Sequence, residues 1–135
     1  MNKILFVDTS YLLALINTQD EYYERAQHLA ELISERLITT EAILTEFANS
    51  LTKPQWRQLA VDTIEDLRED PDVTIISVNS DLFSRGLRLY SERLDKEWSL
   101  TDCISFVVMK DNNLMKALTT DHHFEQAGFR ALLRE

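Results

Sequence analysis

The chain has 135 residues, 44% of them hydrophobic, and this predicts one domain with one core over residues 1–135. Its few glycines and prolines favour a folded, helix-rich protein over a disordered one. The 14 Lys and Arg against 23 Asp and Glu give a net charge of −9, which argues against a passive nucleic-acid binder, because such proteins carry a basic face. The negative charge is compatible with an enzyme that contacts phosphate groups through bound cations.

The sequence predicts a cytoplasmic protein without a membrane attachment. No apolar run approaches the ~20 residues that span a bilayer. The start of the chain lacks an apolar stretch long enough for a signal peptide. The single cysteine, Cys103, has no partner for an internal disulfide, which fits a reducing compartment.

The first strand is predicted over residues 4–7, where four apolar residues follow one another without polar alternation. Such a run is typical of a central strand in a parallel sheet, which is buried on both faces. It ends at Asp8, which is followed by Thr9 and Ser10. Because ligands bind at the carboxyl ends of strands in open α/β sheets, Asp8 is a candidate site residue.

Apolar periodicity and capping residues place the other elements. Helices are predicted over residues 11–18, 21–35, 41–52, 54–69, 81–94, 101–111 and 124–127. Further strands are predicted over residues 37–40, 73–78, 114–120 and 129–133. Strands separated by helices predict an α/β fold with a central, mainly parallel sheet of four to five strands, covered by helices as an α/β/α three-layer domain.

Several packing expectations follow from the helical stripes. Trp56 is predicted in the core, whereas Trp98, in a loop, is the better candidate for stacking on an RNA base. Gly86 inside a helix indicates close packing there, and Cys103 is predicted to be a core thiol. The inner face of residues 81–94 is predicted to carry Leu82, Phe83, Leu87 and Tyr90.

Acidic residues follow three predicted strands or lie on helices that pack over the strand ends. They are Asp8, Glu41, Glu46, Asp102 and Asp121. Each has a simpler structural role: Asp8 and Asp121 fit helix N-caps, and Asp102 fits a capping box begun by Ser99. The joint pattern is more informative, because four of these acids come from separate elements and can converge on one edge of one sheet.

A cluster of carboxylates repels itself unless a cation is present. Hard oxygen ligands without clustered Cys or His favour Mg²⁺ or Mn²⁺. Such a site holds one or two ions, and two ions roughly 4 Å apart stabilise the attacking and leaving oxygens of phosphodiester cleavage. A bound ion also lowers the pKa of its water, so that hydroxide can attack at neutral pH.

Four segments carry a family resemblance: residues 4–10 (ILFVDTS), 45–49 (TEFAN), 99–103 (SLTDC) and 118–124 (LTTDHHF). In order and spacing, over essentially the whole chain, they resemble the PIN-domain nucleases, particularly the VapC-type toxins of toxin–antitoxin systems. The resemblance implies a PIN-like domain and an Mg²⁺- or Mn²⁺-dependent endoribonuclease that cleaves RNA phosphodiester bonds by metal-activated water.

The resemblance also implies site residues and partners. The metal-binding and catalytic carboxylates would be Asp8, Glu46, Asp102 and Asp121. A nearby hydroxyl, from Thr9, Ser10 or Thr120, would orient water or a ligand. Glu41 has no counterpart in the family pattern. A homodimer is implied, and for the toxin branch an antitoxin protein that inserts a segment into the active site.

Two alternatives stay open: a PIN nuclease that processes RNA without an antitoxin, and a non-catalytic Mg²⁺-binding interaction module. A receiver-type module would need an aspartate at the end of a middle strand, where this chain has Asn79. A haloacid-dehalogenase-type phosphatase would need a second aspartate after the first strand, where this chain has Ser10.

The histidines and basic residues complete the candidates. The pair His122–His123 invites a zinc hypothesis, but zinc sites need three or four N or S ligands and His28 is the only other histidine. We therefore expect a surface or RNA-facing pair. The candidates for contacting RNA phosphates are Lys53, Arg57, Arg85, Arg88 and Arg93.

Overall fold

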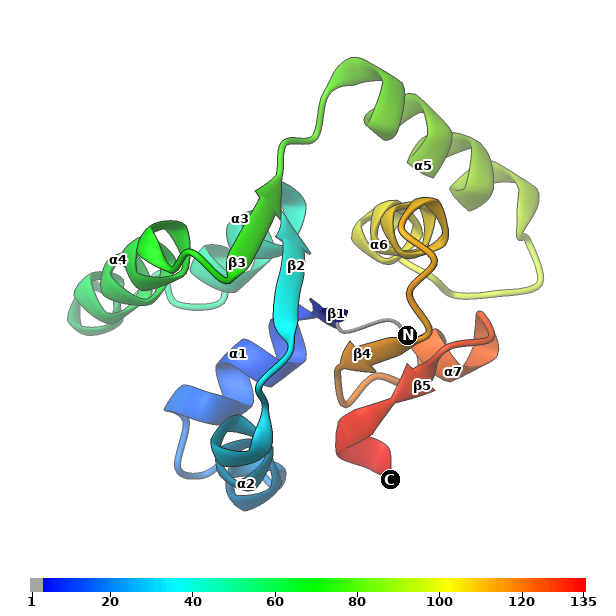
Figure 1. Cartoon of the computed structure of the whole chain (residues 1–135). Helices are drawn as coiled ribbons and strands as arrows, with labels where there is room; N and C mark the ends of the chain where they lie inside the picture. The colour runs from blue at the N-terminus through cyan, green and yellow to red at the C-terminus, as the bar shows by residue number, and fades with distance from the viewer. Residues whose placement is uncertain (1–3) are drawn as a thin grey trace.

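A computed structural model describes residues 4–135, which fold around one parallel sheet with the strand order β3-β2-β1-β4-β5 (Figure 1). The strands are β1 (Ile4–Val7), β2 (Arg36–Thr40), β3 (Val73–Ile76), β4 (Lys116–Leu118) and β5 (Arg130–Ala131). All four strand pairings are parallel. The predicted parallel sheet and the central place of the first strand are therefore confirmed.

Helices cover both faces of the sheet. They are α1 (Thr9–Ile16), α2 (Tyr23–Leu32), α3 (Glu41–Asn49), α4 (Pro54–Glu69), α5 (Ser80–Glu92), α6 (Leu100–Asp111) and α7 (His122–Gln126). In Figure 1, α1–α4 lie on one side and α5–α7 on the other. From β1 to β3 the chain moves across the sheet in one direction, and from β3 to β5 it moves in the other. Because such crossovers are right-handed, the helices of the two halves lie on opposite faces of the sheet. Within residues 4–135, every helix is too short or too polar to span a bilayer.

An aromatic cluster fixes β1 against α6 and α7. The ring of Phe106 on α6 lies 5.0 Å, centroid to centroid, from Phe124 on α7, and both rings are fully buried or nearly so. Phe124 in turn lies 6.2 Å from Phe6 on β1. Edge-to-face and tilted aromatic contacts of this kind add to the stabilisation from burial. The cluster therefore sets the relative positions of the three elements whose ends carry candidate acids.

Several element ends differ from the prediction. The helix predicted from residue 21 begins at Tyr23, because Asp20 accepts the Tyr22 amide in a tight turn instead of capping the helix. The first helix begins at Thr9, directly after Asp8. The predicted strand over residues 129–133 is only β5, followed by the 3₁₀ helix η1 (Leu132–Arg134). These are local turn effects that apolar periodicity does not encode.

The two tryptophans differ in burial from the prediction. Trp98 is 6% exposed and its Nε1 donates to Gln126 Oε1 at 3.0 Å, so the expectation of a base-stacking ring is wrong. Trp56 is 46% exposed, so its predicted core position is also wrong. The ring centroids of Trp98 and Phe106 lie 5.0 Å apart, so the loop before α6 packs against the core.

Helix α5 contacts the protein through a narrower face than its apolar pattern predicts. Leu82 and Gly86 are buried, as expected, and Gly86 lies against Ile104 of α6. The other three apolar residues predicted inward are 45–50% exposed, and that expectation is wrong for Phe83, Leu87 and Tyr90. The reason is that the contact centres on Gly86, which is close enough to α6 to leave the flanking stripes outside.

We expect Gly86→Ala to destabilise the protein, although alanine is the better helix former. A Cβ at this position would lie 2.5 Å from Ile104 Cγ1 and 3.3 Å from Ile104 Cα. Overpacking of this kind costs about 1–3 kcal/mol, more than the ~1 kcal/mol gained from helix propensity. Urea denaturation measures the change in the free energy of unfolding.

The same substitution in an Ile104→Ala background tests the cause, because that background removes Cγ1. There Gly86→Ala should lose most of its cost. Equal stability of Gly86→Ala and the parent protein would contradict the proposed close contact.

Candidate metal centre

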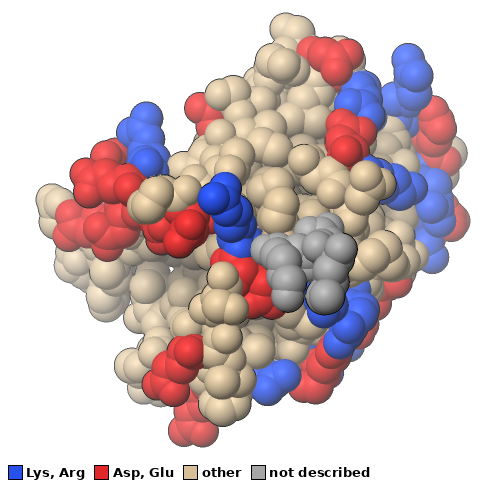
Figure 2. Space-filling view, in the orientation of Figure 1, with Lys and Arg blue, Asp and Glu red and all other residues tan. Residues whose placement is uncertain are grey.

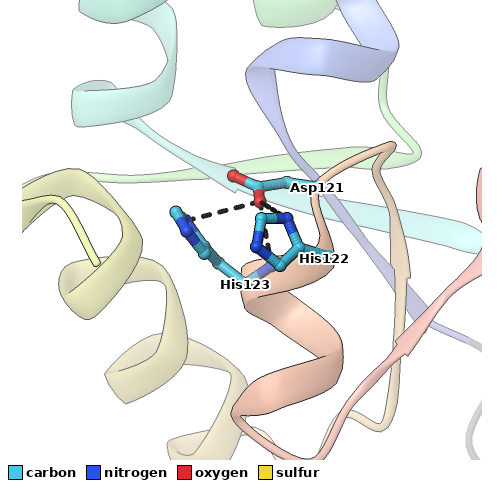
Figure 3. Close-up of side chains that lie close together, drawn as sticks. All are labelled: Asp121, His122 and His123. Atoms are coloured by element: carbon cyan, nitrogen blue, oxygen red, sulfur yellow. Dashed lines mark hydrogen bonds and ion pairs between the residues drawn. The ribbon is translucent and has the colours of Figure 1, made fainter. Parts of the chain in front are cut away.

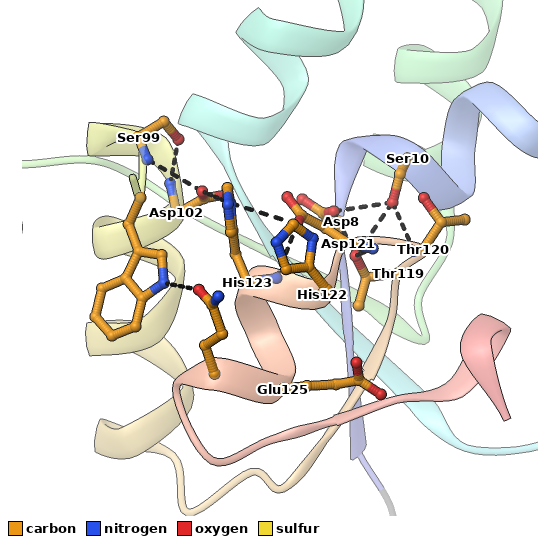
Figure 4. Close-up of polar contacts among 12 residues, drawn as sticks. Asp8, Ser10, Ser99, Asp102, Thr119, Thr120, Asp121, His122, His123 and Glu125 are labelled. Carbon is orange, nitrogen blue, oxygen red and sulfur yellow. Dashed lines mark hydrogen bonds and ion pairs between the residues drawn. The ribbon is translucent and has the colours of Figure 1, made fainter. Parts of the chain in front are cut away.

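All four acids implied as ligands line one cavity of about 390 Å³ at the carboxyl end of the sheet. Asp8 follows β1, and Glu46 lies on α3. Asp102 lies in the first turn of α6, and Asp121 precedes α7. Figure 4 shows Asp8, Asp102 and Asp121 among the polar contacts of this region. The structure thus brings together the four residues that the sequence singled out, and their metal-binding role stays a prediction.

Two hydroxyl groups hold the carboxylate of Asp8. Its Oδ2 accepts hydrogen bonds from Ser10 Oγ at 2.9 Å and from Thr119 Oγ1 at 2.7 Å. Each hydroxyl is oriented by a backbone amide, because Ser10 Oγ accepts from Thr120 N and Thr119 Oγ1 accepts from Asp121 N. The two hydroxyl oxygens also lie 3.1 Å apart, so Ser10, Thr119 and Asp8 form one connected polar network (Figure 4).

The hydroxyl network corrects one detail of the sequence analysis. Ser10 was one of the three expected hydroxyl residues and it does contact Asp8. Thr119 was missed, although it is completely buried at the end of β4. The side chain of Thr9 lines the cavity, and its buried Oγ1 has no hydrogen-bond partner among residues 4–135. Thr120 takes part through its backbone amide.

Asp8 carries its negative charge at an energetic cost. Burial raises its pKa from the ordinary 3.8 to about 6. The hydrogen bonds from Thr119 and Ser10 oppose that rise, whereas the charges of Asp102 and Glu46 add to it. An uncompensated group of carboxylates around a buried one is an arrangement that a divalent cation would stabilise. The donor set therefore fits a hard cation.

Asp102 both caps α6 and lines the acid cavity. It forms the predicted capping box, in which its Oδ2 accepts Ser99 N at 3.1 Å and Ser99 Oγ accepts the Asp102 amide at 2.9 Å. The same Oδ2 lies 3.1 Å from His123 Nδ1. Burial raises the pKa of Asp102, and the nearby charge of Asp121 adds to this.

Asp121 combines the same two roles. It is the N-cap of α7, as predicted, because its Oδ1 accepts the His123 amide at 2.8 Å. Asp8 also occupies an N-cap position, at α1, but its side chain makes no capping bond there. Its carboxylate is turned to the hydroxyls of Ser10 and Thr119 instead.

The two histidines have different surroundings. Figure 3 shows both imidazole rings next to the Asp121 carboxylate. The His122 side chain is 56% exposed, as expected for a surface residue. The His123 side chain is only 20% exposed and lines the acid cavity, with Nδ1 3.4 Å from Asp121 Oδ1. The signal that could have found His123 is its place in the first turn after the capping aspartate.

Glu97 and Glu41 complete the acids near the strand ends. Glu97, in the loop before α6, also lines the acid cavity and was not singled out by the sequence. Its position five residues before Asp102 in an irregular loop offers no periodic signal. Glu41 lies outside this cavity, where its Oε1 accepts the Val78 amide at 3.1 Å.

An apolar cleft adjoins the acid cavity. It lies between α1 and α4, and Trp56 and Lys53 are among its lining residues. The cleft and the acid cavity share Leu13 and Ser50. The exposed ring of Trp56 therefore faces a surface that is continuous with the carboxylates.

Two of the expected phosphate-binding arginines are engaged elsewhere. Arg85 pairs with Asp111 through two hydrogen bonds of 2.7 Å. Arg93 pairs with Asp95 and lies 4.7 Å above the ring of Trp98. Figure 2 shows basic and acidic side chains mixed on the side of the molecule where α5 lies. This face is therefore not a continuous basic track.

Comparisons with known proteins agree with this geometry. The chain is 28% identical to the 23S rRNA-specific endonuclease VapC20 of Mycobacterium tuberculosis, over 93% of this chain and 95% of that protein. The crystal structure of VapC20, described as a sarcin-ricin loop cleaving toxin, superposes with a TM-score of 0.85 at 27% identity, and the match covers 93% of this chain and 95% of that one.

A second solved structure shares the fold. FitAcB from Neisseria gonorrhoeae superposes with a TM-score of 0.63 at 19% identity, over 94% of both chains. A sequence model of the PIN domain matches residues 5–130, which includes all four candidate carboxylates. The chain therefore belongs to the PIN domain family.

Proposed function

We propose that this protein is a divalent-metal-dependent endoribonuclease, built as one PIN domain over residues 1–135, and the toxin of a toxin–antitoxin pair. The observation that carries the proposal is the meeting of four carboxylates from four elements in one cavity of a PIN-domain chain. The similarity to VapC20, a 23S rRNA-specific endonuclease, makes ribosomal RNA the first substrate to test.

The proposed ligands of Mg²⁺ or Mn²⁺ are Asp8, Glu46, Asp102 and Asp121. A cation bound there would supply Lewis-acid charge and an activated water for attack on the phosphodiester. Ser10 and Thr119 fix the Asp8 carboxylate, because both hydroxyls donate to the same oxygen, Oδ2. The helix-capping bonds hold Asp102 and Asp121 in the same way. These residues are therefore oriented before substrate arrives.

Two surfaces are the proposed contact sites for an antitoxin and for a second copy of the chain. We expect an antitoxin segment to occupy the apolar cleft between α1 and α4, because that cleft runs into the acid cavity. A homodimer is proposed with the α5 face as one contact, since Phe83, Leu87 and Tyr90 are about half exposed there. A protein of this kind would act on RNA in the cytoplasm.

We expect Asp8→Asn to abolish RNA cleavage while leaving the fold intact. The amide keeps an oxygen for the two hydroxyls but removes the charge that would hold the cation, so the cleavage rate should fall by about 100-fold or more. The assay uses purified protein and a pool containing 23S rRNA, with Mg²⁺, with Mn²⁺ and with EDTA.

The matched control is Glu31→Gln, which neutralises an exposed acid on α2 and should cleave like the parent protein. Full activity of Asp8→Asn protein, free of parent enzyme, would overturn the site assignment. Metal binding without any cleavage, across a complete set of cellular RNAs, would favour the non-catalytic module.

The raised pKa of Asp8 predicts how stability depends on pH. Its pKa in the folded protein is about 6, above the ordinary 3.8, so between these values the folded state binds more protons than the unfolded state. Stability from this group is therefore full below about pH 4 and is lost as the pH rises through about 6. The full loss amounts to about 3 kcal/mol.

Asp8→Asn should remove this loss. In EDTA, we expect the stability of the variant relative to the parent protein to increase between pH 4 and pH 7.5, by up to about 3 kcal/mol. Urea denaturation at several pH values measures the difference. A difference that stays constant over this range would contradict the energetic cost of the buried Asp8 charge.

Growth separates a toxin from a housekeeping nuclease. We expect expression of the parent protein to arrest bacterial growth, because uncontrolled RNA cleavage stops translation, and expression of Asp8→Asn to be tolerated. Growth curves are recorded with the protein level checked by immunoblot. Harmless expression of active parent enzyme at matched levels would favour the RNA-processing alternative.

A further inference from the structure

His123 is a nitrogen donor placed among the proposed oxygen ligands. Its Nδ1 lies 3.1 Å from Asp102 Oδ2 and 3.4 Å from Asp121 Oδ1. Both carboxylates line the same cavity as His123. The imidazole is held there, because the backbone amide of His123 donates to Asp121 in the first turn of α7. The backbone that carries the ring is therefore fixed next to the acid cluster, and the contact of Nδ1 with Asp102 keeps the ring there.

The contact between His123 Nδ1 and Asp102 Oδ2 is a hydrogen bond in this structure, and a cation bound by both atoms would take the place of the proton between them. The separations also agree with those of two ligands that share one ion. Bonds of about 2.0–2.2 Å at right angles place two ligand atoms about 3 Å apart. Nδ1 of His123 stands at about this distance from one oxygen of Asp102 and one oxygen of Asp121. Asp102 lies in the first turn of α6, whereas Asp121 and His123 lie at the start of α7, so two elements supply the three atoms.

A separate feature of the cavity also points to a ligand. Thr9 lines the cavity and is only 5% exposed. Its Oγ1 has no hydrogen-bond partner among the described residues. Buried hydroxyls almost always have a partner, so an unpartnered one in a residue that lines the cavity is an exception that a ligand bound there would explain.

We propose that His123 binds the cation directly through Nδ1 and that this nitrogen makes the centre select Mn²⁺ over Mg²⁺. The inference rests on the metal site of the proposed function. Mg²⁺ is a hard ion that takes carboxylate and water oxygens, whereas first-row transition ions accept imidazole as well. A centre with one nitrogen donor therefore gains more from Mn²⁺ than a centre made of oxygens alone.

His122 is the natural internal control. It is also an imidazole next to Asp121, and its Nδ1 lies 3.6 Å from Asp121 Oδ1. It is 56% exposed, however, and it is not among the residues that line the acid cavity. The donor atoms of Asp121, His122 and His123 all lie within 4.8 Å of one another, so the difference between the two histidines rests on the exposure of His122 and its absence from the cavity lining. Comparing the two variants therefore tests which imidazole binds the cation.

The experiment measures Mn²⁺ and Mg²⁺ binding to the full-length protein without RNA. Isothermal titration gives both dissociation constants for the parent protein, His123→Ala and His122→Ala. We expect His123→Ala to weaken Mn²⁺ binding by about tenfold or more, as for the loss of a ligand or its supporting group. Mg²⁺ binding should change by less than about threefold, and His122→Ala should alter neither constant.

Pulsed electron paramagnetic resonance of bound Mn²⁺ reads the ligand directly. The parent protein and His122→Ala should show modulation from a coordinated ¹⁴N, and His123→Ala should lack it. This readout does not depend on cleavage, and circular dichroism confirms that each variant is folded.

The outcomes distinguish the two proposals. If the parent protein binds both ions without a ¹⁴N signal, or with the same ion preference as His123→Ala, the assignment of His123 is overturned while the carboxylate site stands. Loss of the ¹⁴N signal in His122→Ala instead of His123→Ala would also overturn it. If neither ion binds the parent protein, the metal site itself fails, and the inference fails with it.

Discussion

The hydrogen bond from Thr119 to Asp8 is the contact on which the candidate site depends. It joins the residue after β1 to the residue after β4, whose backbones also meet where Asp8 N donates to Leu118 O. Without Thr119 and Ser10, a carboxylate that is 5% exposed would lack the donors that partly offset its burial. Because Thr119 also accepts the Asp121 amide, the same hydroxyl positions the start of α7.

The strand order explains why the acids meet at this place. The chain runs from β1 outward to β2 and β3, then returns across the sheet to β4 on the other side of β1. The ends of β1 and β4 therefore lead to helices on opposite faces, which leaves a crevice between them. Asp8 and Asp121 follow these two strands, and α3 and α6 bring Glu46 and Asp102 to the same crevice. A topological property of the fold thus supplies the site before any chemistry is considered.

The sequence predicted the features that depend on local pattern. The apolar run of β1, the alternation of strands and helices, and acids at strand ends were all readable, because parallel sheets gather their carboxyl ends on one edge. Burial of single aromatic rings was not readable. Trp98 lies in a loop, packs edge-to-face against Phe106 and donates a hydrogen bond to Gln126. Trp56, in contrast, lines a cleft at the surface. Thr119 and Glu97 were missed because their positions depend on contacts between distant segments, whereas His123 was expected at the surface although its place just after the capping aspartate was a local signal.

The capping roles of Asp102 and Asp121 and their place in the cavity support each other. A carboxylate at a helix N-terminus is stabilised by free amides, and those amides also fix its rotamer. In Asp102 the capping oxygen Oδ2 accepts Ser99 N and lies against His123, so it is oriented from two sides. The like charges of Asp102 and Asp121 can therefore be held close together in a folded chain, with local helix-terminal stabilisation offsetting part of their mutual repulsion, while hydroxyl groups stabilise Asp8 beside them. A site assembled from such caps would need little rearrangement to receive the proposed cation, which is what electrostatic preorganisation requires.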